Sequence, residues 1–281
     1  MFSTQWWRTS SAYSGTGLLS ITYFMLQATS AYVTLALVSV VVLRKLKMSA
    51  FAAFSVMYFI IIFNLPAAWI WNLTGWIYIM GMKDFAGGIV IHGAAGITGL
   101  IILVRIWQEE KARGLKKSPK EIIRINHGSL TLATLLLIVG WLCFHPGNVL
   151  ALNFDTMIVV FVILISGFAG MISALGTSYI VRKDTGGLLN AVNGILMGLI
   201  VITPLAGFVI PLSAFMLGII SGPLYVKAEI FFSRRKWFSD PVGLLPDHMT
   251  KGIFGIAMIA FFTQHSYTVL SGNPVLPNGF F

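Results

Sequence analysis

The chain has few charged residues and a single cysteine. Of its 281 residues, 10% are charged and only 9 are acidic. The lone cysteine, Cys143, excludes an intrachain disulfide and a cysteine-based metal site. The sequence contains no G-x-S-x-G, P-loop, H-E-x-x-H or C-x-x-C motif, and no strand-like segment precedes Gly87-Gly88, so this pair does not indicate a phosphate-binding loop. We therefore expect neither an enzyme nor a metal protein.

Apolar sequence, in contrast, is abundant. Hydrophobic residues make up 57% of the chain, which exceeds what a soluble core of this size needs. Eight apolar stretches are close to or above the ~20 residues that cross a bilayer as a helix. They cover residues 16–43, 50–71, 85–107, 127–144, 157–180, 188–203, 206–232 and 248–262. We predict an all-α polytopic membrane protein with about eight transmembrane helices, in which residues 1–281 form a single membrane domain.

The basic residues lie almost entirely on one predicted side of the membrane. Apart from Arg8, Lys83 and Lys251, every Lys and Arg falls within or beside the loops that follow the first, third, fifth and seventh stretches. Short cytoplasmic loops carry such an excess. We therefore expect these loops in the cytoplasm, both termini outside, and the plasma membrane as the location. The net charge of +10 then reflects orientation and contact with the lipid bilayer, and we expect no binding of nucleic acid.

A histidine motif occurs twice. Asp84 precedes His92, and Asp240 precedes His248, by the same eight residues, and glycines follow each histidine at the fourth and seventh positions. These glycines share a helix face with the histidine, so each copy predicts a helix that another helix can approach closely. Ionisable residues inside a membrane are costly and usually face a cavity or a partner. His92 and His248 are therefore candidate functional residues.

The two copies of the motif lie on antiparallel spans. In the predicted orientation the third stretch runs inward and the eighth runs outward, which is the pattern of an inverted repeat. The substrate pathway of such a protein lies at the repeat interface near the middle of the membrane. The sixth and eighth stretches are short and rich in glycine, and Pro204 and Pro246 flank them. Interrupted helices of this kind indicate a binding site, so we predict that His92 and His248 meet there.

Four sequence elements share their order and spacing with one family of membrane proteins. They are Asp84-Phe85-Ala86-Gly87-Gly88 with His92, Gly140-Trp141 with Phe144, Ile202-Thr203-Pro204-Leu205-Ala206-Gly207-Phe208, and Asp240-Pro241 with His248. Together they resemble the ammonium transporter (Amt/Mep/Rh) family from about Gln27 to Phe262. The resemblance implies an Amt-like inverted repeat around a narrow hydrophobic pore, ammonium or ammonia as the cargo, and a homotrimer or other membrane subunits as partners.

The same resemblance implies a role for five residues. His92 and His248 would be the paired histidines of the pore, and Asp84 the structural acid near its outer mouth. Trp71 would be the aromatic residue of the outer binding site, and Phe144 one of the stacked phenyl rings that gate the pore. Neutral imidazoles that share a proton in a dry pore can pass NH3 or relay a proton, because apolar walls reject a hydrated cation.

Several features depart from the family pattern. The family fold usually has eleven helices, and the stretches found here align with its third to tenth, so we expect an incomplete inverted repeat. Residues 26–30 contain no aromatic partner for Phe144. Lys251 lies three residues beyond His248 on nearly the same helix face. Its charge would oppose the passage of a cation unless Asp247 or Asp240 neutralises it, so Lys251 is a further pore candidate.

A different functional class is also compatible with the sequence. An incomplete wall cannot expose acidic and histidine side chains to lipid cheaply. The chain can therefore be a non-transporting scaffold subunit of a larger complex, such as a respiratory one. In a variant of this hypothesis a haem b is bound by His92 and His248, or by His127 and His145, since histidines paired across helices ligate haem.

The remaining histidines are predicted to be structural. His127, His145 and His265 lie at the ends of spans, where histidine is comfortable in the membrane interface. His145-Pro146-Gly147 is most simply the turn that ends the fourth span. We therefore expect an interfacial position for these three side chains when they are not haem ligands.

Overall fold

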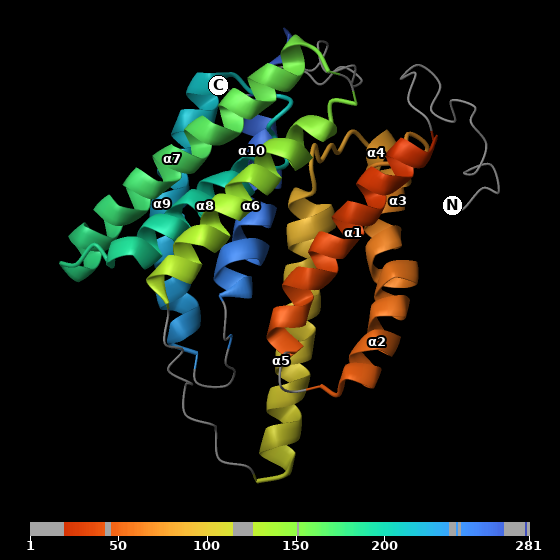
Figure 1. The fold of residues 1–281 in the computed structure, drawn as a ribbon, viewed down its shortest axis with the longest axis vertical. Coiled ribbons are helices and arrows are strands. Elements are labelled where there is room, and N and C mark those ends of the chain that lie inside the picture. The colour runs from red at the N-terminus through yellow and green to blue at the C-terminus, as the bar shows by residue number, and fades with distance from the viewer. Residues whose placement is uncertain are drawn as a thin grey trace.

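The structure is a computed structural model that describes residues 20–42, 46–114, 126–150, 152–235, 240, 243–266 and 279, which form helices joined by turns and loops (Figure 1). In chain order the helices are α1 (Ser20–Val42), α2 (Met48–Met57), η2 (Tyr58–Phe63), α3 (Asn64–Ile70), α4 (Trp76–Ile79), η3 (Gly88–Gly93), α5 (Ala94–Ala112), α6 (His127–Gly147), α7 (Phe154–Arg182), α8 (Gly187–Ile202), α9 (Pro211–Ser233), η4 (Leu245–Met249) and α10 (Thr250–Phe262). The three η segments are π-helical, and each continues directly into an α-helix. The predicted all-α membrane architecture is confirmed.

Six helical segments in the described part of the chain are long and apolar enough to cross a membrane. They cover Ile21–Val42, Met48–Ile70, Gly88–Ala112, His127–Gly147, Phe154–Arg182 and Pro211–Ser233. The sixth and eighth predicted spans are shorter helices. α8 has 16 residues, and η4 with α10 runs from Leu245 to Phe262. The arrangement agrees with about eight helices, of which the two interrupted ones are short.

The boundary between α8 and α9 differs from the predicted one. α9 begins at Pro211, whereas the prediction placed its start at Ala206. Residues 203–208 instead form consecutive turns. Pro204 has no N–H to continue a helix, and its carbonyl accepts a hydrogen bond from the Phe85 N–H at 3.1 Å. Leu205 and Phe208 are buried, so this irregular backbone is covered by protein, the condition under which a membrane tolerates it.

Small residues hold α7, α8 and α9 together. A Cβ atom on Gly198 of α8 would lie 2.1 Å from the Ser166 carbonyl oxygen of α7. At the same place the Ser166 hydroxyl donates a hydrogen bond to the Gly198 carbonyl at 2.8 Å. In lipid, helices associate through such close backbone approach and interhelical hydrogen bonds, since apolar burial gives little advantage there.

The two halves of the chain meet where α10 packs against η3. Figure 1 shows α1 to α5 on one side and α6 to α10 on the other. Gly252 of α10 lies so close to η3 that an added Cβ would be 2.3 Å from the Gly88 carbonyl oxygen. Gly96 of α5 lies equally close to the side chain of Met249. Both glycines are the fourth residue after a motif histidine, so the predicted close approach is present in both copies.

Candidate functional site

The two motif histidines lie in direct contact. His92 is on η3 and His248 is on η4, and their Nδ1 atoms are 3.0 Å apart. The ring centroids are 5.1 Å apart. His92 is buried, whereas His248 is only partly buried. A hydrogen bond between two imidazole nitrogens requires one proton between them, so one ring donates and the other accepts. Two neutral rings can satisfy this arrangement.

The acids of the repeated motif cap the helices that carry the histidines. The Asp84 carboxylate accepts four backbone N–H groups, from Gly87, Gly88, Ile89 and Val90, at 2.7–3.1 Å. The Asp240 carboxylate accepts the Leu244 and Leu245 N–H groups at 3.1 and 2.8 Å. A carboxylate at a helix N-terminus satisfies free donors and complements the positive end of the helix dipole. The spacing of eight residues between acid and histidine therefore corresponds to a capping carboxylate followed by the first turns of the helix it caps.

The π-helical form of both histidine segments is not evident from the sequence. π-helical turns within helices occur frequently at functional sites, because they re-aim side chains by inserting one residue. In η3 the extra turn follows the Asp84 cap, and in η4 it contains Pro246. No residue type in either motif predicts this form, and only the paired occurrence of the motifs points to the location.

Trp71 and Phe144 make different contacts near the histidine pair. The Trp71 indole Nε1 donates a hydrogen bond to the Asp84 carbonyl at 2.6 Å, which ties the end of α3 to the start of η3. Phe144 is on α6, and its ring contacts the His145 ring edge to face, with centroids 5.7 Å apart. Both rings are partly buried. Their assigned roles at the pore mouth and gate stay predictions.

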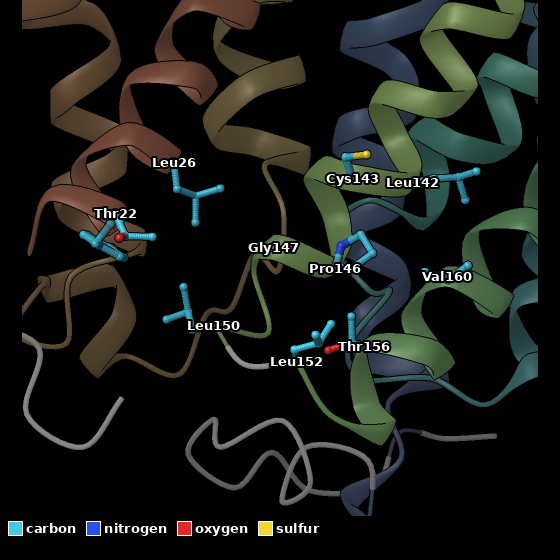
Figure 2. Close-up of a pocket in the computed structure, with 11 residues that line it drawn as sticks. Thr22, Leu26, Leu142, Cys143, Pro146, Gly147, Leu150, Leu152, Thr156 and Val160 are labelled. Carbon is cyan, nitrogen blue, oxygen red and sulfur yellow. The ribbon is translucent and has the colours of Figure 1, made fainter. Parts of the chain in front are cut away.

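No aromatic residue of α1 between 26 and 30 can pair with Phe144, as the sequence indicated. A cavity of about 470 Å³ instead separates parts of α1 from α6 and α7. Figure 2 shows Thr22 and Leu26 of α1 on one side of it, and Cys143 and Pro146 of α6 on the other. Tyr23 also lines this cavity, one helical turn before Gln27, whose amide donates to the Tyr23 hydroxyl at 3.1 Å. Tyr23 is therefore the aromatic residue of α1 that lines this cavity.

Lys251 is fully buried and paired. Its Nζ lies 3.4 Å from the Asp247 carboxylate and donates to the Pro246 carbonyl. The ammonium group is 5.0 Å from the centroid of the Tyr225 ring on α9. The next residue, Gly252, lies beside His92 instead, because a Cβ added to it would be 3.0 Å from the Cβ of His92. Lys251 thus reaches toward α9 and carries its own counterion, which is the neutralisation by Asp247 that the sequence left open.

The site contains one stack of rings that the sequence did not predict. Trp141 of α6 lies parallel to His92, with centroids 6.1 Å apart and an angle of 6°. Trp141 also stacks on His145, with centroids 5.9 Å apart and an angle of 21°. His145 lies in the last turn of α6, which continues to Gly147, and its side chain is only 1% exposed. The turn begins at Asn148, three residues after the predicted turn at His145.

The residues do not fit the haem hypothesis. The His92 and His248 nitrogens are at hydrogen-bond distance, which leaves no space for an iron atom between them. His127 and His145 are the first residue and the nineteenth residue of the same helix, and 18 residues of α-helix span about 27 Å. Neither pair can provide the two axial ligands of one haem.

Comparison with known proteins gives a consistent set of matches. The model of the Ammonium Transporter Family matches residues 4–278. The ammonium transporter of Bacillus subtilis is 29% identical over 83% of this chain and 55% of its own length. Ammonium transporter Amt1 of Archaeoglobus fulgidus is 29% identical over 90% of this chain and 64% of its own length.

Solved structures share the fold. Saccharomyces cerevisiae Mep2 superposes with a TM-score of 0.81 at 22% identity, over 94% of this chain and 58% of Mep2. A sensor Amt protein superposes with a TM-score of 0.76 at 28% identity, over 89% of this chain and 63% of that protein. The chain therefore spans between half and two thirds of the length of these four proteins.

Proposed function

The chain belongs to the Ammonium Transporter Family, and we propose that it passes ammonium or ammonia across a membrane between its two helical halves. The observation that carries the proposal is the contact of His92 with His248 across the two copies of one motif. The relatives named above are described as ammonium transporters. Because the chain spans only part of their length, its own transport activity needs a direct test.

The geometry supports passage in the uncharged form. The two imidazoles hold each other through Nδ1, so each ring retains Nε2 as its second polar atom. Trp141 covers one face of His92. An ammonium ion that enters the space beside these rings must lose its hydrating water. The free-energy cost of this dehydration is far greater for the cation than for ammonia. The proton therefore separates from the nitrogen at the pore, and it either stays behind or moves along the imidazole pair.

Orientation and assembly form part of the proposal. We place both termini outside and the four basic loops in the cytoplasm of a cell whose plasma membrane holds the protein, since Lys and Arg concentrate in those loops. The expected partners are further copies of the chain in a homotrimer, or other membrane subunits. Either would cover the groove between α1 and α6, whose lining is mostly apolar.

Flux through liposomes that contain the purified chain tests the proposal. An inward ammonium gradient is expected to change the internal pH or to produce a current. His92→Ala is expected to abolish it, because the imidazole pair is lost. His127→Ala is the matched control, since His127 is exposed at the start of α6, away from the pair, and its flux is expected to match the unchanged chain.

The scaffold hypothesis makes the opposite forecast. A non-transporting subunit gives no ammonium-dependent signal, with or without His92, and co-purifies with other membrane subunits from its native membrane. Robust flux that disappears in His92→Ala excludes that alternative. Absent flux from a folded, correctly assembled chain excludes the transporter.

A further inference from the structure

His145 has no assigned role, yet it is buried beside the histidine pair. The Trp141 ring stacks on both His92 and His145, with centroids 6.1 and 5.9 Å apart. His145 is 1% exposed. A buried, ionisable ring at this depth is costly unless both of its nitrogens are used. Each ring nitrogen of His145 is therefore expected to have a hydrogen-bond partner.

One nitrogen is fixed by Thr203 in the turn after α8. The Thr203 hydroxyl donates to the Leu199 carbonyl at 2.7 Å, and its oxygen lies 2.9 Å from Nε2 of His145. Since the hydroxyl proton is already used, Nε2 is the donor in this contact. In the neutral ring the other nitrogen, Nδ1, then carries a lone pair and accepts hydrogen bonds.

The accepting nitrogen has no protein partner. Nδ1 of His145 is buried without a hydrogen bond to any described residue. The indole N–H of Trp141, the ring that stacks on both His145 and His92, is likewise buried without a partner among the described residues. Buried polar atoms in native proteins are nearly always satisfied by protein or by a small bound molecule. One free acceptor and one free donor on adjacent rings match a molecule that carries both functions.

We propose that His145 is a third imidazole of the pore and binds the cargo through Nδ1, beside Trp141, which also stacks on His92 of the His92–His248 pair. The ligand is ammonia, whose N–H group donates to Nδ1 of His145 and whose lone pair accepts the indole N–H of Trp141. In the proposed orientation this position lies toward the outer end of α6, so the cargo meets His145 before the pair. The inference rests on the proposed function for the identity of the ligand, while the geometry of His145 stands independently of it.

Nitrogen-15 NMR of the histidines tests binding without any transport measurement. The chain contains only 5 histidines, so single His→Asn variants assign each imidazole signal. Ammonium chloride is titrated into the labelled, detergent-solubilised chain at constant pH, with potassium chloride as the matched titration. A saturable shift of the His145 Nδ1 signal with ammonium alone supports the proposal. An equal shift of the His145 signal with potassium overturns the proposal. So does a His145 signal that does not respond to ammonium while the His92 signal does. Either result leaves a bound water as the partner of Nδ1.

Variants separate binding from a structural role. His145→Leu removes the acceptor, and we expect the KM for ammonium to rise about tenfold, the effect of losing one hydrogen bond, with little change in kcat. His145→Gln keeps an acceptor and is expected to restore most of the affinity. Thr203→Val frees Nε2, so the tautomer is no longer fixed, and the ammonium-dependent shift is expected to weaken. An unchanged KM in folded His145→Leu overturns the inference.

The two proposals fail in different ways. If liposomes show no flux but the His145 signal still responds to ammonium, the transporter proposal fails and the binding site stands. If flux is robust and depends on His92, while His145 neither responds nor changes KM, the third imidazole fails and the transporter proposal stands.

Discussion

At the scale of single residues, Asp84 shows how a charge can be buried in a membrane protein. Its side chain is 4% exposed, and four backbone donors compensate the carboxylate. The same residue type at the second motif copy, Asp240, accepts two backbone donors. The pair therefore allows the energetic value of a cap to be compared within one chain.

Asp84→Asn is expected to lower the free energy of unfolding by about 2–4 kcal/mol. The amide keeps one acceptor oxygen but turns an N–H₂ group toward donors, so about half of the cap bonds are lost. The measurement is thermal or denaturant unfolding of the detergent-solubilised chain. Asp240→Asn is the matched variant, and a smaller loss is expected because Asp240 is less buried than Asp84. Equal losses in the two variants would contradict this account of the cap.

Lys251 provides a second residue-scale prediction. Removing one partner of a buried ion pair leaves the other charge uncompensated, so Lys251→Met is expected to destabilise the fold by about 3–5 kcal/mol. The double variant with Asp247→Asn is expected to recover most of that loss. The check is a double-mutant cycle on unfolding. Additive effects would mean that Lys251 and Asp247 do not form the pair described here.

At the scale of elements, the contact between η3 and α10 positions both histidines. Gly252→Ala places a methyl group against the Gly88 carbonyl, where the distance would be 2.3 Å. We expect the two helices to move apart, the His92–His248 contact to break, and ammonium flux to fall by at least tenfold, with a stability loss of about 1–3 kcal/mol.

The control for this prediction is Gly176→Ala on α7. A Cβ atom there has nothing within 4 Å, so the methyl group adds helix propensity without a clash. Its flux and unfolding are expected to match or exceed those of the unchanged chain. A Gly252→Ala variant that retains full flux would show that close approach of η3 and α10 is not required.

The sequence predicted the elements better than it predicted their ends. Long apolar stretches fix the spans, and the repeated spacing of acid, histidine and glycines was enough to place His92 against His248. The position of His145 was not predictable in the same way. Pro146 and Gly147 are turn residues in most contexts, but α6 includes both, and the Asn148 side chain then donates to the Phe144 carbonyl at 3.0 Å. This local side-chain hydrogen bond ends α6 beyond the Pro-Gly pair.

The π-helical segments mark a second limit. A one-residue bulge changes which side chains face the interface. It requires no particular residue type, so composition and periodicity do not reveal it. The direction of Lys251 is a similar case. Its spacing from His248 put both on nearly one face, and only the contact with Tyr225 shows that the ammonium group turns toward α9.

At the scale of the whole molecule, orientation in the membrane is the property that the fold itself does not determine. In the predicted orientation the loop between α6 and α7 lies outside the cell. The C-terminal end of α5 lies on the cytoplasmic side of the membrane. Leu152 in that loop is 95% exposed, and Arg113 is exposed at the end of α5. These two positions report the two sides.

The proposed orientation predicts opposite labelling of these positions. Cys143 is the only cysteine, so a Cys143→Ser chain provides a clean background for single cysteines. A membrane-impermeant maleimide applied to intact cells is expected to label Leu152→Cys, which faces outside, and to label Arg113→Cys only after the membrane is opened. The reverse pattern would mean that the basic loops face outward, against the distribution of Lys and Arg. Labelling of both positions from the same side would contradict the antiparallel arrangement of the two motif helices, and with it the inverted repeat on which the pore rests.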